Sequence, residues 1–223
     1  MFQHGIVGGI DLVRELVEEI GVSVVMKKND FKTKPVLEGK KVILRPFQIE
    51  DGQLMLKFMN DPEIRYFTGS DASDEDANAP ISEEESAQIL EWYKTRNEKD
   101  DRLDLAIIDK ENHNVVGEVV FNEYDEDTQS VNFRILIGEK GRGKGLGTEA
   151  TALFIQYGFE TLALQRIELE VYSFNPRAEM VYKKVGFILE GVKRKNFIYN
   201  EELFDTRFYA MLNSDYQKLN RGF

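Results

Sequence analysis

The spacing of hydrophobic residues predicts strands and helices over most of the chain. An apolar run at 41–47 is typical of a strand, and Pro46 either ends that strand or places it at a sheet edge. Residues 50–60 have the periodicity of a short amphipathic helix. Ser82 and Glu85 form a capping-box pattern, which predicts a second helix that begins there and ends near residue 96.

The second half of the chain is predicted to contain six further strands and two helices. Short apolar runs between turn-forming residues indicate strands at 102–109, 115–124, 131–137, 166–172, 187–197 and 203–212. Helical spacing covers 145–162 and 176–185, and Pro176 suits the first position of the second helix. Strands and helices in this order predict an α/β fold with a mixed sheet in one domain, without internal repeats.

Two flanks and one internal stretch fall outside this pattern. Residues 1–36 are predicted to be an N-terminal extension with a short amphipathic helix at 11–20, and they lack the basic start and long apolar core of a signal peptide. The domain is then 37–213 and the C-terminal tail 214–223. The stretch 69–86 carries seven acidic residues and no basic one, and its first half is predicted to be a mobile loop.

Composition narrows the classes of function that fit this fold. The chain of 223 residues contains no cysteine and two histidines, so we expect no disulfide and no metal site. No apolar run approaches the roughly 18 residues of a membrane span, and we expect a cytoplasmic protein without membrane contact. The net charge of −11 argues against nucleic acid as a partner and is compatible with a cationic one, although it could serve solubility alone.

The most informative segment is a glycine-rich loop between a predicted strand and a predicted helix, at 138–150. Such a loop exposes backbone N–H groups at a helix N-terminus, where an anion is favoured. Lys140, Arg142 and Lys144 add positive charge at the same place in an acidic chain. The loop therefore predicts a phosphate-binding site, for which three motifs compete.

Two of the three motifs fit incompletely. Gly138 and Gly143-Lys144 match the GxxxxGK of a P-loop, but Gly145 stands where a Ser or Thr should bind magnesium. Gly145, Gly147 and Ala150 match the GxGxxA of a dinucleotide site, yet the preceding strands look antiparallel where βαβ units would be expected. The third motif, R-x-x-G-x-G, is complete from Arg142 to Gly147.

This third motif, with a second one downstream, resembles the GNAT superfamily of N-acetyltransferases. Asn175-Pro-Arg-Ala178 followed by Tyr182-Lys-Lys-Val-Gly-Phe187 is similar to the family's Asn-x-x-Ala and Tyr-x-x-x-Gly-Phe signature. The resemblance covers roughly 38–213, and the branch looks like the ribosomal-protein alanine and spermidine acetyltransferases. It implies the family's acyltransferase fold, in which two central parallel strands splay apart, here 131–138 and 166–172.

The resemblance also implies where acetyl-CoA, the cosubstrate, would bind without a metal. The pantetheine arm would lie against the strand backbone, and the pyrophosphate against the loop N–H groups. Asn175 would bond the amide arm of the cofactor, cap the following helix, or do both. The strand residues implied are Ile135, Leu136 and Ile137, and the loop residues are Arg142, Gly143, Lys144, Gly145, Leu146, Gly147 and Thr148.

Acetyl transfer to an amine needs a group that takes a proton and a group that gives one. A lysine-type amine has a pKa of about 10.4 and arrives mostly protonated. Glu170 is the candidate base, although a strand glutamate paired with a cation is an equal interpretation, and Glu118 and Glu123 are alternatives. Tyr182 matches the tyrosine that many family members use to protonate the leaving thiolate.

The predicted function is acetyl-CoA-dependent N-acetylation of a primary amine by direct attack. The acceptor is left open between a protein N-terminus, a polyamine and another small amine, with the acidic stretch favouring a cation. The alternative is a catalytically inactive, CoA-binding regulatory module. The family resemblance also suggests a homodimer.

Overall fold

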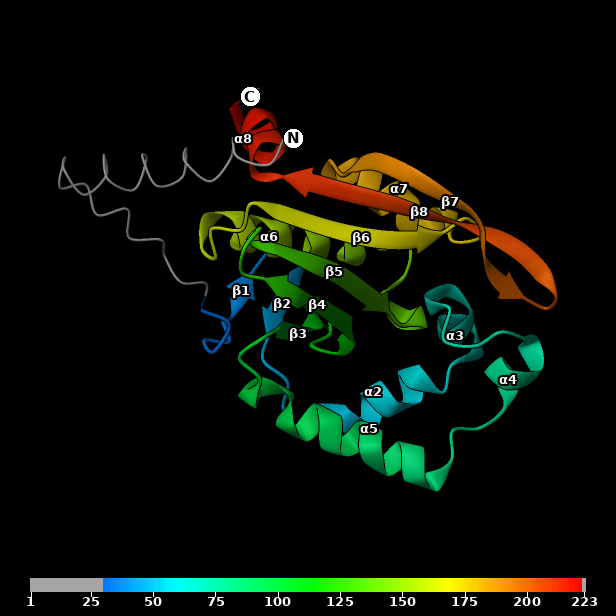
Figure 1. Ribbon diagram of the computed structural model, residues 1–223. Coiled ribbons are helices and arrows are strands. Elements are labelled where there is room, and N and C mark those ends of the chain that lie inside the picture. Colours follow the sequence, from blue (N-terminus) through cyan, green and yellow to red (C-terminus); the bar gives the residue numbers. More distant parts are fainter. Residues whose placement is uncertain (1–29, 222–223) are drawn as a thin grey trace, which may run out of the picture.

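The computed structural model describes residues 30–221 and contains one eight-stranded sheet with helices on both faces (Figure 1). The strands are β1 (Leu37–Glu38), β2 (Val42–Arg45), β3 (Leu103–Asp109), β4 (Val115–Asp125), β5 (Ser130–Ile137), β6 (Arg166–Tyr172), β7 (Ile188–Tyr199) and β8 (Glu202–Leu212). The helices are α2 (Asp51–Met59), α3 (Pro62–Thr68), α4 (Asp74–Asn78), α5 (Glu83–Thr95), α6 (Leu146–Glu160), α7 (Pro176–Val185) and α8 (Asn213–Arg221). The predicted mixed α/β fold is confirmed.

The sheet has the order β1-β2-β3-β4-β5-β6-β8-β7, and every neighbouring pair is antiparallel except β5 and β6. These two parallel strands pair only at their beginnings, where Ser130 lies opposite Arg166 and Asn132 opposite Glu168. Beyond that point they separate, as Figure 1 shows, and they share no further paired residues. The sheet therefore opens in its middle, between two halves whose strands are antiparallel and paired with their neighbours.

Two hydrophobic cores lie on opposite faces of the sheet. One packs α6 and α7 against the strands, with Phe154 and Ile155 of α6 almost fully buried. The other packs α2 and α5 against the opposite face, through Met55 and Tyr93. Since both faces are covered, β3 is buried along its whole length. The opening between β5 and β6 thus lies in a sheet that is packed on both faces.

Most predicted elements occur within a few residues of their expected bounds, including the capping box at Ser82 and Glu85. The sequence analysis missed α3, and the loop expected in the first half of 69–86 is wrong because α4 forms there, capped by Ser73. Within the predicted C-terminal tail, residues 214–221 belong to α8. The predicted helix at 11–20 lies outside the described residues.

The last residues of the predicted N-terminal extension pack on the domain. Phe31 is only 2% exposed and belongs to the core beneath α6, where its ring lies 5.0 Å from that of Tyr124. The ammonium of Lys34 donates to the carbonyl oxygens of Phe31, Lys99 and Arg102 at 2.6–2.8 Å. These contacts attach residues 31–34 to β4 and to the segment that precedes β3. Across the described range 30–221, no helix is both long and apolar enough to cross a bilayer.

Candidate active site

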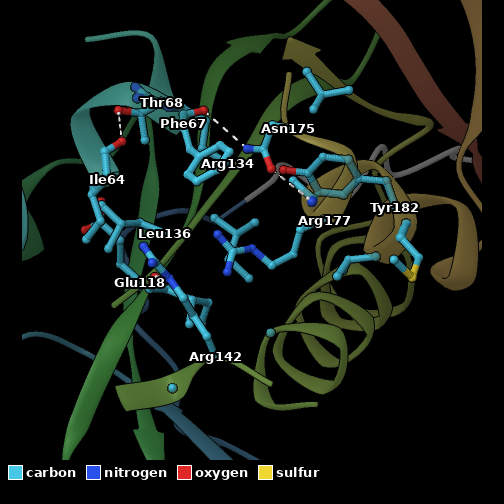
Figure 2. A pocket seen from close by; sticks show the side chains of 18 of the residues that line it. Ile64, Phe67, Thr68, Glu118, Arg134, Leu136, Arg142, Asn175, Arg177 and Tyr182 are labelled. Carbon is cyan, nitrogen blue, oxygen red and sulfur yellow. Dashed lines mark hydrogen bonds between the residues drawn. The ribbon is translucent and has the colours of Figure 1, made fainter. Parts of the chain in front are cut away.

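The separation of β5 from β6 opens into a cavity of about 440 Å³ (Figure 2). Its walls come from β5 and the loop after it on one side, β6 and α7 on the other, and α2 with α3 across the opening. The predicted site residues that line it are Ile135, Leu136, Ile137, Arg142, Gly143, Gly145, Gly147, Thr148, Glu170, Asn175 and Tyr182. The fold thus brings together residues from three separate parts of the sequence.

The glycine-rich loop delivers backbone donors to one end of this cavity. Gly145 precedes α6 with a φ of 80°, a left-handed conformation that glycine adopts without strain. No side chain caps the helix there, so the N–H groups of its first turn can serve an external acceptor. These groups, with the helix dipole, suit the phosphates of acetyl-CoA, and the cavity wall formed by β5 suits its pantetheine arm.

Two of the predicted loop residues direct their side chains away from the cavity. Leu146 is buried in the core beneath α6, and the ammonium of Lys144 lies 3.3 Å from a carboxylate oxygen of Asp109. Lys41 donates to the carbonyl oxygen of Lys144 at 3.1 Å and fixes the outer side of the loop. Only the backbone of these two residues is therefore available to a cofactor.

Asn175 caps α7, as predicted, and also connects this helix to α3. Its Oδ1 accepts from the N–H of Ala178 at 3.1 Å, and its Nδ2 donates to the carbonyl oxygen of Phe67 at 3.3 Å (Figure 2). Because both ends of the amide are engaged, its first role is to hold α7 against α3 at the wall of the cavity.

Tyr182 projects from α7 and is only 6% exposed. Burial raises the pKa of its hydroxyl, and the positive charge of nearby Arg134 opposes that shift. The hydroxyl therefore keeps its proton at neutral pH. Its ring packs edge-on against Phe133 of β5, with centroids 6.3 Å apart, so the tyrosine spans the gap between the two walls.

Glu170 lies on β6 with its side chain exposed to the cavity, and it forms no ion pair within residues 30–221. The parallel register of β5 and β6 would place Arg134 opposite Glu170 if the strands had stayed paired. Arg134 also lines the cavity without an ion pair in the described part of the chain. The unpaired carboxylate favours the interpretation of Glu170 as a base over that of a salt-bridged strand residue.

The two alternative glutamates have different surroundings. Glu118 lines the cavity, but one of its oxygens accepts from Arg96 at 2.7 Å and from the hydroxyl of Tyr93 at 3.1 Å. Arg96 is buried, also contacts Asp104, and stacks over the ring of Tyr93. Glu123 does not line the cavity and accepts from Asn122. A base at Glu118 would have to act from within a buried ion-pair network.

Sequence reasoning missed the residues that α3 brings to the site. Ile64, Phe67 and Thr68 line the cavity, and Glu63 accepts from both Arg142 and Arg177. The signals of α3 were present in the sequence. Asp61 accepts from two N–H groups of the first turn, Pro62 follows it, and Gly69 ends the helix at a φ of 67°.

No cluster of three or more His, Cys, Asp or Glu side chains suited to a metal ion occurs among the described residues. The donors that this cavity offers are instead backbone N–H groups and arginines, which match phosphate. Its carboxylate and its tyrosine match proton transfer to and from an amide-forming reaction.

Comparison with known proteins agrees with this chemistry. Residues 41–188 match the model of the acetyltransferase (GNAT) domain. The probable N-acetyltransferase YjcK of Bacillus subtilis is 31% identical over 183 residues, covering 81% of this chain and 98% of that protein. The spermidine N(1)-acetyltransferase of Vibrio cholerae is 29% identical over 138 residues, covering 60% of this chain and 79% of that protein.

A solved structure shows the same fold. The crystal structure of spermidine N-acetyltransferase from Vibrio cholerae in complex with CoA and spermine superposes with a TM-score of 0.67. The superposition covers 80% of this chain and 99% of that chain, at 23% sequence identity.

Proposed function

The chain belongs to the GNAT family of N-acetyltransferases, and we propose that it transfers the acetyl group of acetyl-CoA to a primary amine of a polyamine by direct attack. The observation that carries this proposal is the cavity between β5 and β6. This one cavity is lined by the glycine-rich loop, with its backbone donors, and by Glu170 and Tyr182.

The residues of the loop and of β5 would hold the cofactor. The first-turn N–H groups of α6 would receive its phosphates, and the unpaired part of β5 at Ile135 and Ile137 would lie beside its pantetheine arm. Bound acetyl-CoA supplies a thioester, which is an acetyl group activated toward amines. No metal is needed in this scheme.

Glu170 would be the general base of the reaction, and Tyr182 would be its general acid. The Glu170 carboxylate takes a proton from the acceptor ammonium, directly or through water, and so makes the nitrogen nucleophilic. The Tyr182 hydroxyl, which burial keeps protonated, donates its proton to the departing sulfur. One nitrogen–carbon bond forms as one carbon–sulfur bond breaks, and the nitrogen then releases its second proton to solvent as the amide forms. Glu170 passes the proton that it took back to Tyr182 through solvent, so both side chains return to their starting states and one proton is released per turnover.

A cationic acceptor is supported by charge and by the relatives. Glu170 presents a carboxylate without an ion pair in the described residues, and the whole chain carries a net charge of −11. The surrounding field therefore concentrates cations. Relatives named for spermidine acetylation point to the same class of acceptor.

An acceptor panel with purified full-length protein tests this proposal. Thiol release from acetyl-CoA is followed with spermidine, spermine, a peptide with a free N-terminus and the same peptide with a blocked N-terminus. We expect the polyamines to give the highest kcat/KM and Glu170→Gln to lower it. Faster release with the free peptide would replace the polyamine by a protein N-terminus. No release with any amine, despite CoA binding, would favour a regulatory CoA-binding module.

The homodimer suggested by the sequence is also a proposal. One solved neighbour, a spermidine N-acetyltransferase from Vibrio cholerae, is described as dodecameric. Sedimentation velocity of the full chain, with and without CoA, checks whether this protein associates as a dimer, forms a larger assembly or is a monomer.

A further inference from the structure

One carboxylate joins two opposite walls of the cavity. Glu63, in the first turn of α3, accepts from Arg177 at 2.9 Å and also forms an ion pair with Arg142. Arg142 belongs to the loop after β5, whereas Arg177 lies in the first turn of α7. Figure 2 shows both arginines reaching into the cavity from different sides. The bridge therefore crosses the opening between β5 and β6.

The two arginines face the cavity, but the carboxylate does not. Arg142 and Arg177 line the cavity wall, and Glu63 binds them from outside it. The side chain of Arg142 is 14% exposed, and its Nε donates to the carbonyl oxygen of Ile137 at 3.0 Å. The guanidinium of Arg177 lies over the ring of Phe67, 5.1 Å from its centroid. Both cations are thus held in place by contacts other than Glu63.

The ion pairs of Glu63 with Arg142 and Arg177 leave an excess of one positive charge. The hydrogen bond from Arg177 lowers the pKa of the Glu63 carboxyl, burial opposes that shift, and the contact with Arg142 adds to the lowering. Glu63 is therefore ionised at neutral pH, and one negative charge faces two positive ones. Each guanidinium has five N–H donors, more than a single shared carboxylate can use.

We propose that Arg142 and Arg177 bind the diphosphate of the cofactor from the two walls of the cavity, and that Glu63 is the internal carboxylate that the diphosphate displaces. This inference rests on the proposed use of acetyl-CoA. A diphosphate brings more negative charge than one carboxylate, and arginine pairs with phosphate oxygens in a bidentate geometry. Glu63 lowers the affinity for the cofactor, because its carboxylate competes with the diphosphate for the two cations.

Calorimetry with two probes tests this competition. CoA carries phosphates, and pantetheine carries the same thiol arm without them. Glu63→Gln should bind CoA about three- to tenfold more tightly than wild type, because two partly exposed ion pairs no longer compete. Arg177→Gln should bind CoA about tenfold more weakly, and Arg177→Lys should lie between it and wild type. Neither change should alter the affinity for pantetheine, measured by competition.

Matched variants control for net charge and for folding. Glu84→Gln removes an exposed carboxylate on α5, and Arg194→Gln removes an exposed cation on β7, both remote from the cavity. These two variants should bind CoA as wild type does. Melting curves of all variants verify that each is folded. The tighter binding of Glu63→Gln should also shrink as salt is added, because screening weakens the competing ion pairs.

Three results would overturn this inference without touching the proposed function. Weaker CoA binding by Glu63→Gln would make Glu63 a strap that retains the cofactor. Unchanged CoA binding in both Glu63→Gln and Arg177→Gln would separate the bridge from the phosphates while leaving the proposed function intact. An equal loss of CoA and pantetheine in Arg177→Gln would remove the arginine from phosphate binding. If wild type bound no CoA, the proposed function would fail together with this inference.

Discussion

At the scale of single residues, the proposed chemistry depends most on the hydroxyl of Tyr182. The residue is almost fully buried, and burial raises the pKa of its hydroxyl, so the proton to be donated is present at neutral pH. Tyr182→Phe deletes that proton and little contact area. We predict that it lowers single-turnover rates by roughly 10²–10⁴-fold, with CoA affinity by calorimetry nearly unchanged.

A second tyrosine provides the control for this prediction. Tyr157 lies on α6, is partly buried and does not line the cavity. Tyr157→Phe should therefore leave turnover close to that of wild type. An unchanged single-turnover rate in Tyr182→Phe would assign proton donation to another group, and a joint loss of rate and CoA affinity would make Tyr182 a residue for packing.

Gly145 tests the phosphate loop at the same scale. The φ of 80° is strained for any residue with a side chain, and a glutamate here would place a carboxylate beside the proposed phosphate site. We predict that Gly145→Glu abolishes measurable CoA binding in calorimetry. Gly191→Glu, in an open position on β7, is the matched control and should bind CoA normally. Retained affinity in Gly145→Glu would remove the loop from the cofactor site.

Motifs predicted these residues because each has a local signature. The loop glycines, Asn175 and Tyr182 stand at fixed spacings, so the sequence alone could indicate a common site. Arg177 and Glu63 have no such signature, since their roles arise only when α3 and α7 lie on opposite sides of one opening. The sequence also could not show that Lys144 turns outward to Asp109.

At the scale of elements, the carboxylate of Glu179 links α7 to β8 through hydrogen bonds. Glu179 accepts from the hydroxyl of Tyr209 at 2.5 Å and from Arg207 at 2.7 Å, and it also pairs with Lys183 at 2.6 Å. Burial alone would raise the pKa of the Glu179 carboxyl, but these hydrogen bonds and charges outweigh it and lower the pKa below 4.5. The ionised carboxylate thus positions the helix that carries Tyr182.

This lowered pKa makes the contribution of Glu179 depend on pH. Its stabilisation is fully present above the ordinary pKa of 4.5 and is lost as the pH falls through the lower, folded-state value. We predict that Glu179→Gln lowers the free energy of unfolding by about 1–3 kcal/mol near neutral pH. Urea titrations over a pH series should show this difference shrinking below pH 4.5. A difference independent of pH would mean that the ionised carboxylate is not the stabilising form.

Strong local patterns decided which elements could be predicted. The periodicity of α5 begins at a capping box, and β3 to β6 are separated by clear turns, so their bounds were close. The helix α3 is short, and its buried face has one fully buried residue, Ile64. Its existence depends on its caps more than on hydrophobic periodicity. In α4 the polar composition suggested a loop, whereas hydrogen bonds from Tyr199 and Asn200 to Asp74 hold the helix against the β7–β8 hairpin.

At the scale of the whole molecule, the sheet can open between β5 and β6 because each of these strands is hydrogen-bonded to a neighbour on its other side. β5 pairs along most of its length with β4, and β6 pairs along its whole length with β8. Both strands therefore keep most of their backbone hydrogen bonds although they pair with each other only at their beginnings, and few hydrogen bonds are lost where they separate. This arrangement involves contacts between distant segments. Only the family resemblance, and not the pattern of any strand, predicted it.

Tertiary contacts also indicate where the folded domain begins. The predicted boundary after residue 36 leaves Phe31 and Lys34 in the extension, yet Phe31 is 2% exposed in the core and Lys34 binds three carbonyl oxygens. Loss of a buried phenylalanine side chain typically costs about 3–5 kcal/mol. We therefore place the start of the cooperative unit at or before Phe31.

Two truncated chains distinguish a domain that begins after residue 36 from one that begins at or before Phe31. A chain that begins at Met26 keeps Phe31 and Lys34, and we predict that it folds and binds CoA with the affinity of the full chain. A chain that begins at Leu37 lacks both contacts and should unfold at a markedly lower urea concentration. Equal midpoints of urea unfolding for the two truncated chains would show that Phe31 does not contribute to the stability of the domain. If the chain from Met26 were folded but bound CoA weakly, residues 1–25 would have to contribute to the active site, because every described residue that lines the cavity is still present in that chain.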